Sequence, residues 1–287
     1  MSEEMFIGID MGGTWLRGAL VRNNAVISPI LTRPIDNKAS SEVVLSSLYE
    51  LIGELISMSG PIQCTICAIG IGVPGLVDSG SGIVYDVLNI PSWKELPLRT
   101  RLEERFGMRA FPDNDANCFA WGEYNCGKGR GSHSMIGLTI GTGLGAGIVL
   151  DGKLYSGASG AAGEFGMVDY LDKNYEYYAS GSFFQNVHGL GGQMIFERAA
   201  QNDPHALELY SEFGGHLGNA IRMILYSYDV ELIVLGGSVS KAWSFFQDSM
   251  YKALAGHAFA RSLHKLKIGV SELENSGILG AAALCLI

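Results

Sequence analysis

The sequence predicts a mixed α/β protein of two similar lobes with a cleft between them. Its 287 residues exceed the usual length of one domain, so we expect two domains. A glycine-rich stretch at residues 7–18, IGIDMGGTWLRG, has a counterpart at residues 138–147, LTIGTGLGAG. The stretches share glycines at a constant offset: Gly8, Gly12 and Gly18 correspond to Gly137, Gly141 and Gly147. This repeat indicates an internal duplication.

The first lobe, which we place at residues 1–113, begins with a hairpin. Residues 5–21 predict two apolar strands joined by a glycine turn, because no Walker pattern is present. Residues 40–61 predict a helix that ends at Gly60 and Pro61. Its buried face is predicted to carry Val44, Leu48, Leu51, Leu55 and Ile56. A strand at 65–73, a helix at 98–107 and a short strand at 109–112 complete this half.

The pattern restarts after residue 113, and we place the second lobe at residues 114–272. A helix at 115–124 precedes a second hairpin at 135–150. A long helix at about 205–228 and a strand at 230–237 follow. The last segment, about 273–287, is a small-residue helix that we expect to pack back on the first lobe. This order of predicted helices and strands is therefore typical of two α/β units with a cleft between them.

Composition excludes several functional classes. The chain has 20 basic and 29 acidic residues, a net charge of -9, which argues against a nucleic-acid partner. No apolar run approaches the roughly 20 residues that span a bilayer. The acidic start MSEE is unlike a signal peptide, so we expect a cytoplasmic protein without a membrane partner.

The cysteines indicate core packing, whereas the glycine content indicates close backbone approaches. Cys64 and Cys67 form a CxxC pair in a predicted strand, and without a second pair we interpret them as core rather than as a redox or zinc site. Glycine is unusual, because 39 residues is about twice the usual share of ~7%. The chain therefore requires close backbone approaches or backbone freedom at many positions.

Both glycine turns have the composition of a phosphate-binding loop. Glycine lets backbone N–H groups approach phosphate oxygens, and a hydroxyl adds a further donor. The first set is Asp10, Gly12, Gly13 and Thr14; the second is Gly141, Thr142, Gly143 and Gly145. Together they predict a clamp on a magnesium nucleotide, with Asp10 facing the metal through water, since Mg²⁺ keeps several waters. Tight hairpins and a turn-forming Asp10 are the alternatives.

Six motifs in order identify a resemblance to a known family. They are GIDMGGTWLRGAL, IGVPGLVD, NDANCFAWGE, IGTGLGAGIVLDGKLYSGASGAAGEFG, IVLGGSV and SGILGAAAL, between about residues 6 and 284. The chain resembles the ROK family of repressors, open reading frames and sugar kinases. The resemblance implies a two-lobed, actin-like ATPase fold of the ribonuclease H type, with a duplicated βββαβα core and an interlobe cleft. ROK repressors carry an N-terminal helix-turn-helix domain, for which we expect no room before residue 6.

The resemblance places a catalytic base at Asp115 and a sugar-binding amide at Asn114. A kinase needs a carboxylate that orients the attacking hydroxyl and accepts its proton, which agrees with this role. An ordinary Asp pKa of about 3.9 would leave Asp115 ionised at pH 7. The alternative interpretation of the DNDAN stretch is a helix N-cap.

Further sugar ligands follow from the same resemblance. Glu164 and Glu176 match family glutamates that bind sugar hydroxyls, and the backbone at Gly75 and the side chain of Asn89 match segments that line the sugar cleft. Neighbouring rings either cover the apolar face of the sugar or belong to the core: Tyr175, Tyr177 and Tyr178. Gly236 and Gly237 match the adenosine motif, where absent side chains make space for the nucleoside; a strand that ends in a turn is the alternative.

The sequence departs from the family at the zinc loop. Many ROK kinases have a histidine and a cysteine cluster there, but the histidine position is Met167, and the segment up to Tyr178 contains no Cys or His. Because zinc needs about four such ligands, we predict no zinc and a loop held by packing. The change also removes a sugar contact, which leaves the substrate less defined.

These observations predict ATP- and Mg²⁺-dependent phosphorylation of a hexose hydroxyl, normally the one on C6. Glucose is the first candidate; fructose, allose, mannose and N-acetylmannosamine stay open, as does polyphosphate as donor. The alternatives are a catalytically silent sugar or nucleotide sensor and a polymerising actin-like protein. Homodimerisation is a family expectation.

Overall fold

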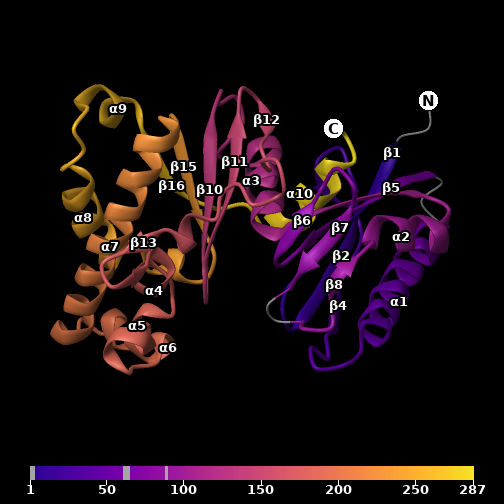
Figure 1. Cartoon of the computed structure of the whole chain (residues 1–287), viewed down its shortest axis with the longest axis horizontal. Coiled ribbons are helices and arrows are strands. Elements are labelled where there is room, and N and C mark those ends of the chain that lie inside the picture. Colours follow the sequence, from indigo (N-terminus) through magenta and orange to yellow (C-terminus); the bar gives the residue numbers. More distant parts are fainter. Residues whose placement is uncertain (1–3, 61–64, 88–89) are drawn as a thin grey trace.

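The computed structural model describes residues 4–60, 65–87 and 90–287, and it contains two main sheets with two helices between them (Figure 1). The first sheet has the strand order β3-β2-β1-β5-β9, with β4 paired to β2. Its strands are β1 (Glu4–Met11), β2 (Trp15–Arg22), β3 (Ala25–Val26), β4 (Leu31–Pro34), β5 (Thr65–Val73) and β9 (Arg109–Asn114). The strands that follow the hairpin, β5 and β9, run parallel to β1.

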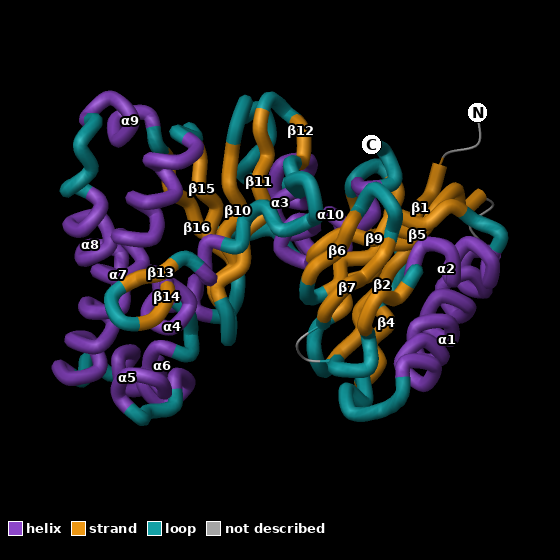
Figure 2. The backbone as a smooth tube through the Cα atoms, viewed as in Figure 1, coloured by secondary structure: helices purple, strands orange, loops and turns teal. Residues whose placement is uncertain are grey.

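Two helices, α1 (Ser41–Ser59) and α2 (Leu98–Phe106), lie beside the first sheet, away from the second sheet (Figure 2). The predicted buried face of α1 is confirmed except at Ile56, which is half-buried, while Leu45 and Ile52 join the core. A small three-stranded sheet, which the sequence did not predict, extends the same lobe. Its strands are β6 (Leu76–Asp78), β7 (Ile83–Asp86) and β8 (Lys94–Leu96).

The second sheet has the order β12-β11-β10-β15-β16. Its strands are β10 (Met135–Ile140), β11 (Leu144–Leu150), β12 (Lys153–Leu154), β15 (Leu232–Gly236) and β16 (Lys267–Val270). The long helix α7 (Pro204–Tyr228) matches the predicted one and packs against α8 (Trp243–Leu254). Their buried side chains form one core with those of the sheet.

Short elements complete this half of the molecule. The helices are α4 (Tyr175–Ala179), α5 (Phe183–His188), α6 (Gly192–Ala200) and α9 (Ala260–Lys265), with 3-10 turns η2 (Phe165–Met167) and η3 (Val239–Ala242). A two-stranded hairpin joins β13 (Asp169–Tyr170) to β14 (Lys173–Asn174). No helix in the described part of the chain has the length and apolar character needed to cross a membrane.

The two hairpins confirm the repeat but correct its register. Gly8 on β1 is opposite Ala19, whereas its counterpart Gly137 on β10 is opposite Gly147. The second hairpin turn is one residue shorter than the first, so the constant offset holds only up to the turn. Gly147 therefore corresponds in space to Ala19, and the predicted match with Gly18 is wrong by one residue.

Two helices, α3 (Asp115–Cys126) and α10 (Ser276–Leu284), lie between the main sheets and pack against each other (Figure 1). The contact is very close: a Cβ at Gly280 would be 1.7 Å from the carbonyl oxygen of Cys118. A Cβ at Gly8 would likewise be 2.2 Å from the carbonyl oxygen of Ile278. The small side chains of the last segment therefore let α10 lie against both α3 and the first sheet.

Cys67 is half-buried and packs with α10 and the first sheet, and Cys64 lies outside the described residues. The assignment of residues 1–113 with about 273–287 to one lobe, and of 114–272 to the other, stays a prediction.

Candidate active site

Asp115 is the first residue of α3, and Asn114 is its N-cap. The Asn114 side-chain oxygen accepts hydrogen bonds from the amides of Ala116 (2.8 Å) and Asn117 (3.2 Å). The Asn114 side-chain nitrogen donates to the carbonyl oxygen of Gly75 at 2.9 Å. The N-cap interpretation of DNDAN is thus correct for Asn114, and capping leaves Asp115 free for another role.

A neighbouring acid fixes this helix start. Asp113, which is almost fully buried, accepts hydrogen bonds from the Asn114 amide and from the Asn117 side chain, each at 2.7 Å. Burial raises its pKa, and these hydrogen bonds oppose the rise. Sequence reasoning did not single out Asp113, because a buried acid in a short strand has no local signature.

The environment of Asp115 overturns the expectation of an ordinary acid. Burial raises its pKa to about 7, and the negative charges of Asp10 and Glu164 add to the increase. The backbone amide of Ala116 donates to Oδ1 of Asp115 at 2.9 Å and partly opposes the rise. Near neutral pH this carboxyl group is therefore close to half-ionised, which suits proton exchange.

Asp10 is the last but one residue of β1, next to the first glycine turn. Burial raises its pKa, and the guanidinium of Arg17, 3.8 Å away, opposes that increase. Arg17 also donates to the side-chain oxygen of Asn275 at 2.6 Å, at the start of α10. A Cβ at Gly277 would lie 2.9 Å from the Asp10 carboxyl carbon. Asp10 is thus held between the first hairpin and α10, close enough to Asp115 for their charges to interact.

Both glycine turns present unused backbone donors. The amide of Gly12 donates across its turn to Trp15, and the amide of Gly141 donates to Gly143. Within the described residues the next amides of each turn donate to no other group of the chain: Gly13 and Thr14 in the first, Thr142 and Gly143 in the second. Pairs of adjacent free N–H groups are suited to bind phosphate oxygens.

The two predicted sugar glutamates occupy different places. Glu176, in α4, accepts a hydrogen bond from the Leu144 amide at 3.0 Å, directly after the second glycine turn. A Cβ at Gly143 would lie 2.5 Å from the same carboxylate. Glu164, at the start of η2, is exposed as a residue, but its carboxyl group is partly desolvated; this desolvation and the Glu176 charge raise its pKa. The structure therefore brings Glu164 near Asp115 and Glu176 near Glu164, and it ties Glu176 to the glycine turn.

Aromatic side chains hold the loop that bears these glutamates. Tyr170 stacks on the buried Tyr175 with ring centres 4.3 Å apart, and its hydroxyl lies 3.1 Å from Nδ1 of His216. The Tyr178 hydroxyl bonds to Asp172. Tyr170, Tyr175 and Tyr178 therefore pack within this loop and against His216. The absence of zinc stays a prediction. The described residues contain no group of three or more His, Cys, Asp or Glu placed to bind a metal.

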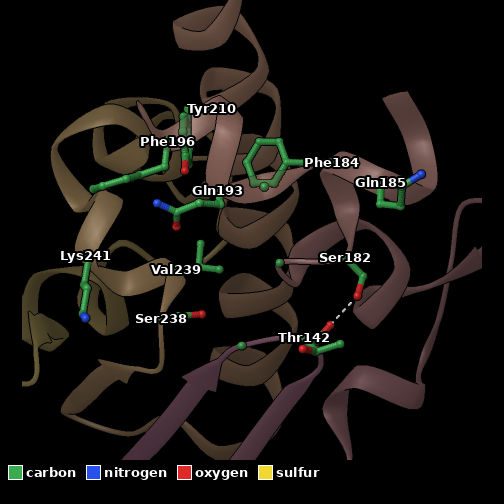
Figure 3. Close-up of a pocket in the computed structure, with 13 residues that line it drawn as sticks. Thr142, Ser182, Phe184, Gln185, Gln193, Phe196, Tyr210, Ser238, Val239 and Lys241 are labelled. Atoms are coloured by element: carbon green, nitrogen blue, oxygen red, sulfur yellow. Dashed lines mark hydrogen bonds between the residues drawn. The ribbon is translucent and has the colours of Figure 1, made fainter. Parts of the chain in front are cut away.

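A pocket of about 460 Å³ lies beside the second glycine turn (Figure 3). The carbonyl of Thr142 in its wall accepts hydrogen bonds from the hydroxyls of Ser180 (2.9 Å) and Ser182 (2.6 Å). Its lining combines rings and polar groups: Phe184, Gln185, Gln193, Phe196, Tyr210, Ser238 and Lys241. Sequence reasoning missed these residues, because the short helices α5 and α6 that supply four of them show no clear period.

The glycines of the predicted adenosine motif are closely packed against other parts of the chain. A Cβ at Gly236 would lie 2.4 Å from the ring of Phe119 in α3. Gly237 has φ of 82°, and a Cβ there would lie 2.4 Å from the Ile140 carbonyl oxygen. Their absent side chains make room for α3 and β10, and the next residues, Ser238 and Val239, line the pocket. The adenosine role of the two glycines stays a prediction. Asn89 lies outside the described residues.

The fold and the site define a two-lobed α/β protein with paired glycine turns, the arrangement of the actin-like ATPase fold. A model of the ROK family matches residues 6–286, and the chain belongs to this family.

Its relatives include both enzymes and repressors. A glucokinase of Halalkalibacterium halodurans is 28% identical over 99% of this chain and 96% of its own. The xylose repressor of Bacillus subtilis is 26% identical over 97% of this chain and 76% of its own. A solved ROK family glucokinase from Streptomyces griseus, in complex with glucose and AMPPNP, is 27% identical with a TM-score of 0.81, covering 98% of both chains.

Proposed function

We propose that the protein is an ATP-dependent hexose kinase that uses Asp115 as its base. The observation that carries this proposal is the position of Asp115, which lies at the start of α3 near Asp10 and Glu164 and has a pKa of about 7. A group with this pKa accepts a proton from a hydroxyl efficiently near neutral pH.

The pocket beside the second glycine turn supports ATP as the donor. Its volume of about 460 Å³ suits a nucleoside, and the rings of Phe196 and Tyr210 offer apolar faces. Lys241 and the free amides of Thr142 and Gly143 add positive charge and donors toward phosphate. Thr14 and Gly13 provide the matching donors from the first turn.

The carboxylates fit a magnesium ion that accompanies ATP. Asp10 and Asp115 lie close enough for their charges to interact, Arg17 is the cation that opposes the Asp10 charge, and Mg²⁺ is normally held by one or two carboxylates, phosphate oxygens and water. Asp10 would hold the ion through water. When bound, the ion neutralises charge on the transferring phosphoryl group.

Different residues of the chain then accept the proton of the sugar hydroxyl and position the sugar. The amide of Ala116 fixes Oδ1 of Asp115, so that the other oxygen is free to accept the proton of the sugar hydroxyl. The hydroxyl oxygen bonds to the γ-phosphorus as the bond to ADP breaks, and the proton passes to Asp115. Glu164 and Asn114 position the sugar, together with the backbone at Gly75. Closure of the lobes excludes water, which competes as an acceptor.

Glucose is the proposed substrate, with phosphorylation on C6. The retained carboxylates Glu164 and Glu176 and the relatives named glucokinase support this choice. Fructose, allose, mannose and N-acetylmannosamine are the competing substrates, and polyphosphate is the competing donor. We also propose that the protein forms a homodimer, that it acts in the cytoplasm and that it binds no zinc.

ADP release with Mg-ATP across aldohexoses, ketohexoses and amino sugars tests the proposal. We expect turnover with one strongly preferred hexose. A sugar sensor is the second candidate, because relatives of the chain include xylose repressors. Saturable sugar binding without ADP release from any sugar would favour the sensor and overturn the kinase.

A further inference from the structure

A third glycine-rich loop, separate from the two glycine turns, follows α3 at residues 127–132, with the sequence GKGRGS. The buried Glu123 fixes it, because its carboxylate accepts the Lys128 amide at 3.0 Å and its carbonyl accepts the Gly129 amide at 2.9 Å. A Cβ at Gly129 would lie 2.7 Å from the Tyr124 Cα and 2.2 Å from the Met135 sulfur, so glycine is required there. These contacts hold the loop against the end of α3.

A pocket of about 210 Å³ opens between this loop and the start of β16. Four cationic side chains line it: Lys128, Arg130, Lys265 and Lys267. Glu231 is the acidic residue of the lining. Such a concentration of positive charge is notable in a chain whose net charge is -9.

The anionic neighbours neutralise only part of this charge. Lys128 pairs with Glu272 at 2.9 Å. The Glu231 carboxylate accepts the amides of His133 and Ser134, and these hydrogen bonds, with nearby Lys267, hold its pKa below the ordinary range. Within the described residues, no ion pair engages the remaining cations, which are Arg130, Lys265 and Lys267.

The backbone of the loop adds a donor to these cations. Gly131 lines the pocket with φ of 81°, and no atom lies within 4 Å of the position its Cβ would take. In the described part of the chain its amide donates to no other group. A free amide beside a guanidinium and two ammonium groups is an arrangement that binds anions.

We propose that this pocket is a second anion site, which takes a small phosphate-bearing anion. A volume of about 210 Å³ admits a phosphate or diphosphate group but not a whole nucleotide. The guanidinium of Arg130 supplies a bidentate contact to phosphate oxygens, and the lysines supply charge.

The pocket is separate from the candidate active site. It lies at the amino ends of β15 and β16, whereas the turn at Gly141–Gly143 follows the carboxyl end of β10 in the same sheet. The six residues of β10 span about 20 Å. The proposal therefore stands independently of any role of Asp115.

Calorimetric titration with inorganic pyrophosphate, without Mg²⁺ and at low ionic strength, tests this site. We compare the wild type with the pair Arg130→Gln and Lys267→Gln. The control pair, Lys38→Gln and Lys252→Gln, changes exposed lysines elsewhere by the same total charge. We expect saturable binding that weakens at least about tenfold in the first pair and stays unchanged in the control. Equal binding by both pairs, or no saturable binding to the wild type at millimolar pyrophosphate, would overturn the proposal.

Two further readouts sharpen the result. Glycerol 3-phosphate, which is not a product of the proposed reaction, in place of pyrophosphate distinguishes an organic phosphate from an inorganic anion as the source of the phosphate group, and a loss of its binding in the first pair supports the site equally. ADP release by the first pair should match that of the wild type, which shows that the variant is folded and separates a failure of this site from a failure of the kinase proposal.

Discussion

The carboxylate of Asp10, at the end of β1, raises the pKa of Asp115, at the start of α3, although more than a hundred residues separate them in sequence. Burial is the larger cause, and the like charge adds to it. The fold thus brings an acid from each half of the duplicated chain to one place. The pairing gives the candidate base a pKa near neutrality.

The first prediction concerns the pH dependence of catalysis. Because Asp115 must be deprotonated to accept a proton, kcat/KM should rise with pH through an apparent pKa of about 7. Below that value the rate should fall about tenfold per pH unit. Steady-state rates between pH 5 and 9 measure this profile, and a rate that is flat from pH 5 to 8 would show that Asp115 does not titrate there.

The second prediction concerns stability. The folded-state pKa of Asp115 exceeds its value in the unfolded chain, so the folded protein binds the proton more tightly and loses stability as pH rises from about 4 to about 7. Asp115→Asn removes this cost and should raise Tm by a few degrees at pH 8, with a smaller gain at pH 5.

Thermal melts of Asp115→Asn at both pH values check this stability effect, with Asp248→Asn, an exposed acid on α8, as control. The control should change Tm little at either pH. An equal gain in Tm for Asp115→Asn at pH 5 and pH 8 would contradict the assigned pKa shift.

The third prediction separates two roles for Glu176. Its hydrogen bond to the Leu144 amide ties it to the second glycine turn, so Glu176→Ala should loosen the turn and raise KM for ATP by about tenfold. Glu176→Gln keeps an acceptor for that amide and should affect ATP less. A rise in the sugar KM alone, with the ATP KM unchanged, would assign Glu176 to the sugar.

The fourth prediction concerns the contact between α3 and α10. A Cβ at Gly280 would overlap the Cys118 carbonyl oxygen, so Gly280→Ala should cost about 1–3 kcal/mol of unfolding free energy. The matched control is Gly53→Ala in α1, where the new Cβ meets nothing within 4 Å and should stabilise by up to about 1 kcal/mol. Urea unfolding of both variants tests the contact, and equal stabilities would count against it.

The sequence predicted the long, regular elements of the fold, because their apolar periodicity and end residues are local signals. The hairpins at β1–β2 and β10–β11, and the helices α1 and α7, follow from apolar periodicity and from glycine or proline at their ends. The strands of the small sheet have only three or four residues, and α4 to α6 have five to nine, too few for a clear period.

The candidate site also combines residues that have a local sequence signal with surroundings that have none. The glycine turns and Asp115 stand out in the sequence, but the pKa of Asp115 depends on Asp10 and Glu164, which only the tertiary fold brings near. The reason for glycine at Gly236 likewise lies in Phe119, far away in the chain. A sequence therefore indicates which residues carry the chemistry better than it indicates what surrounds them.

The central claim is that Asp115 is the base, and Asp115→Asn tests it most directly because the change keeps the size and removes the proton acceptor. Its kcat with Mg-ATP and the preferred hexose should fall by at least about a hundredfold, the usual contribution of a general base, while the Kd for that sugar stays within a few-fold of the wild type. A variant that keeps kcat near that of the wild type would contradict the account.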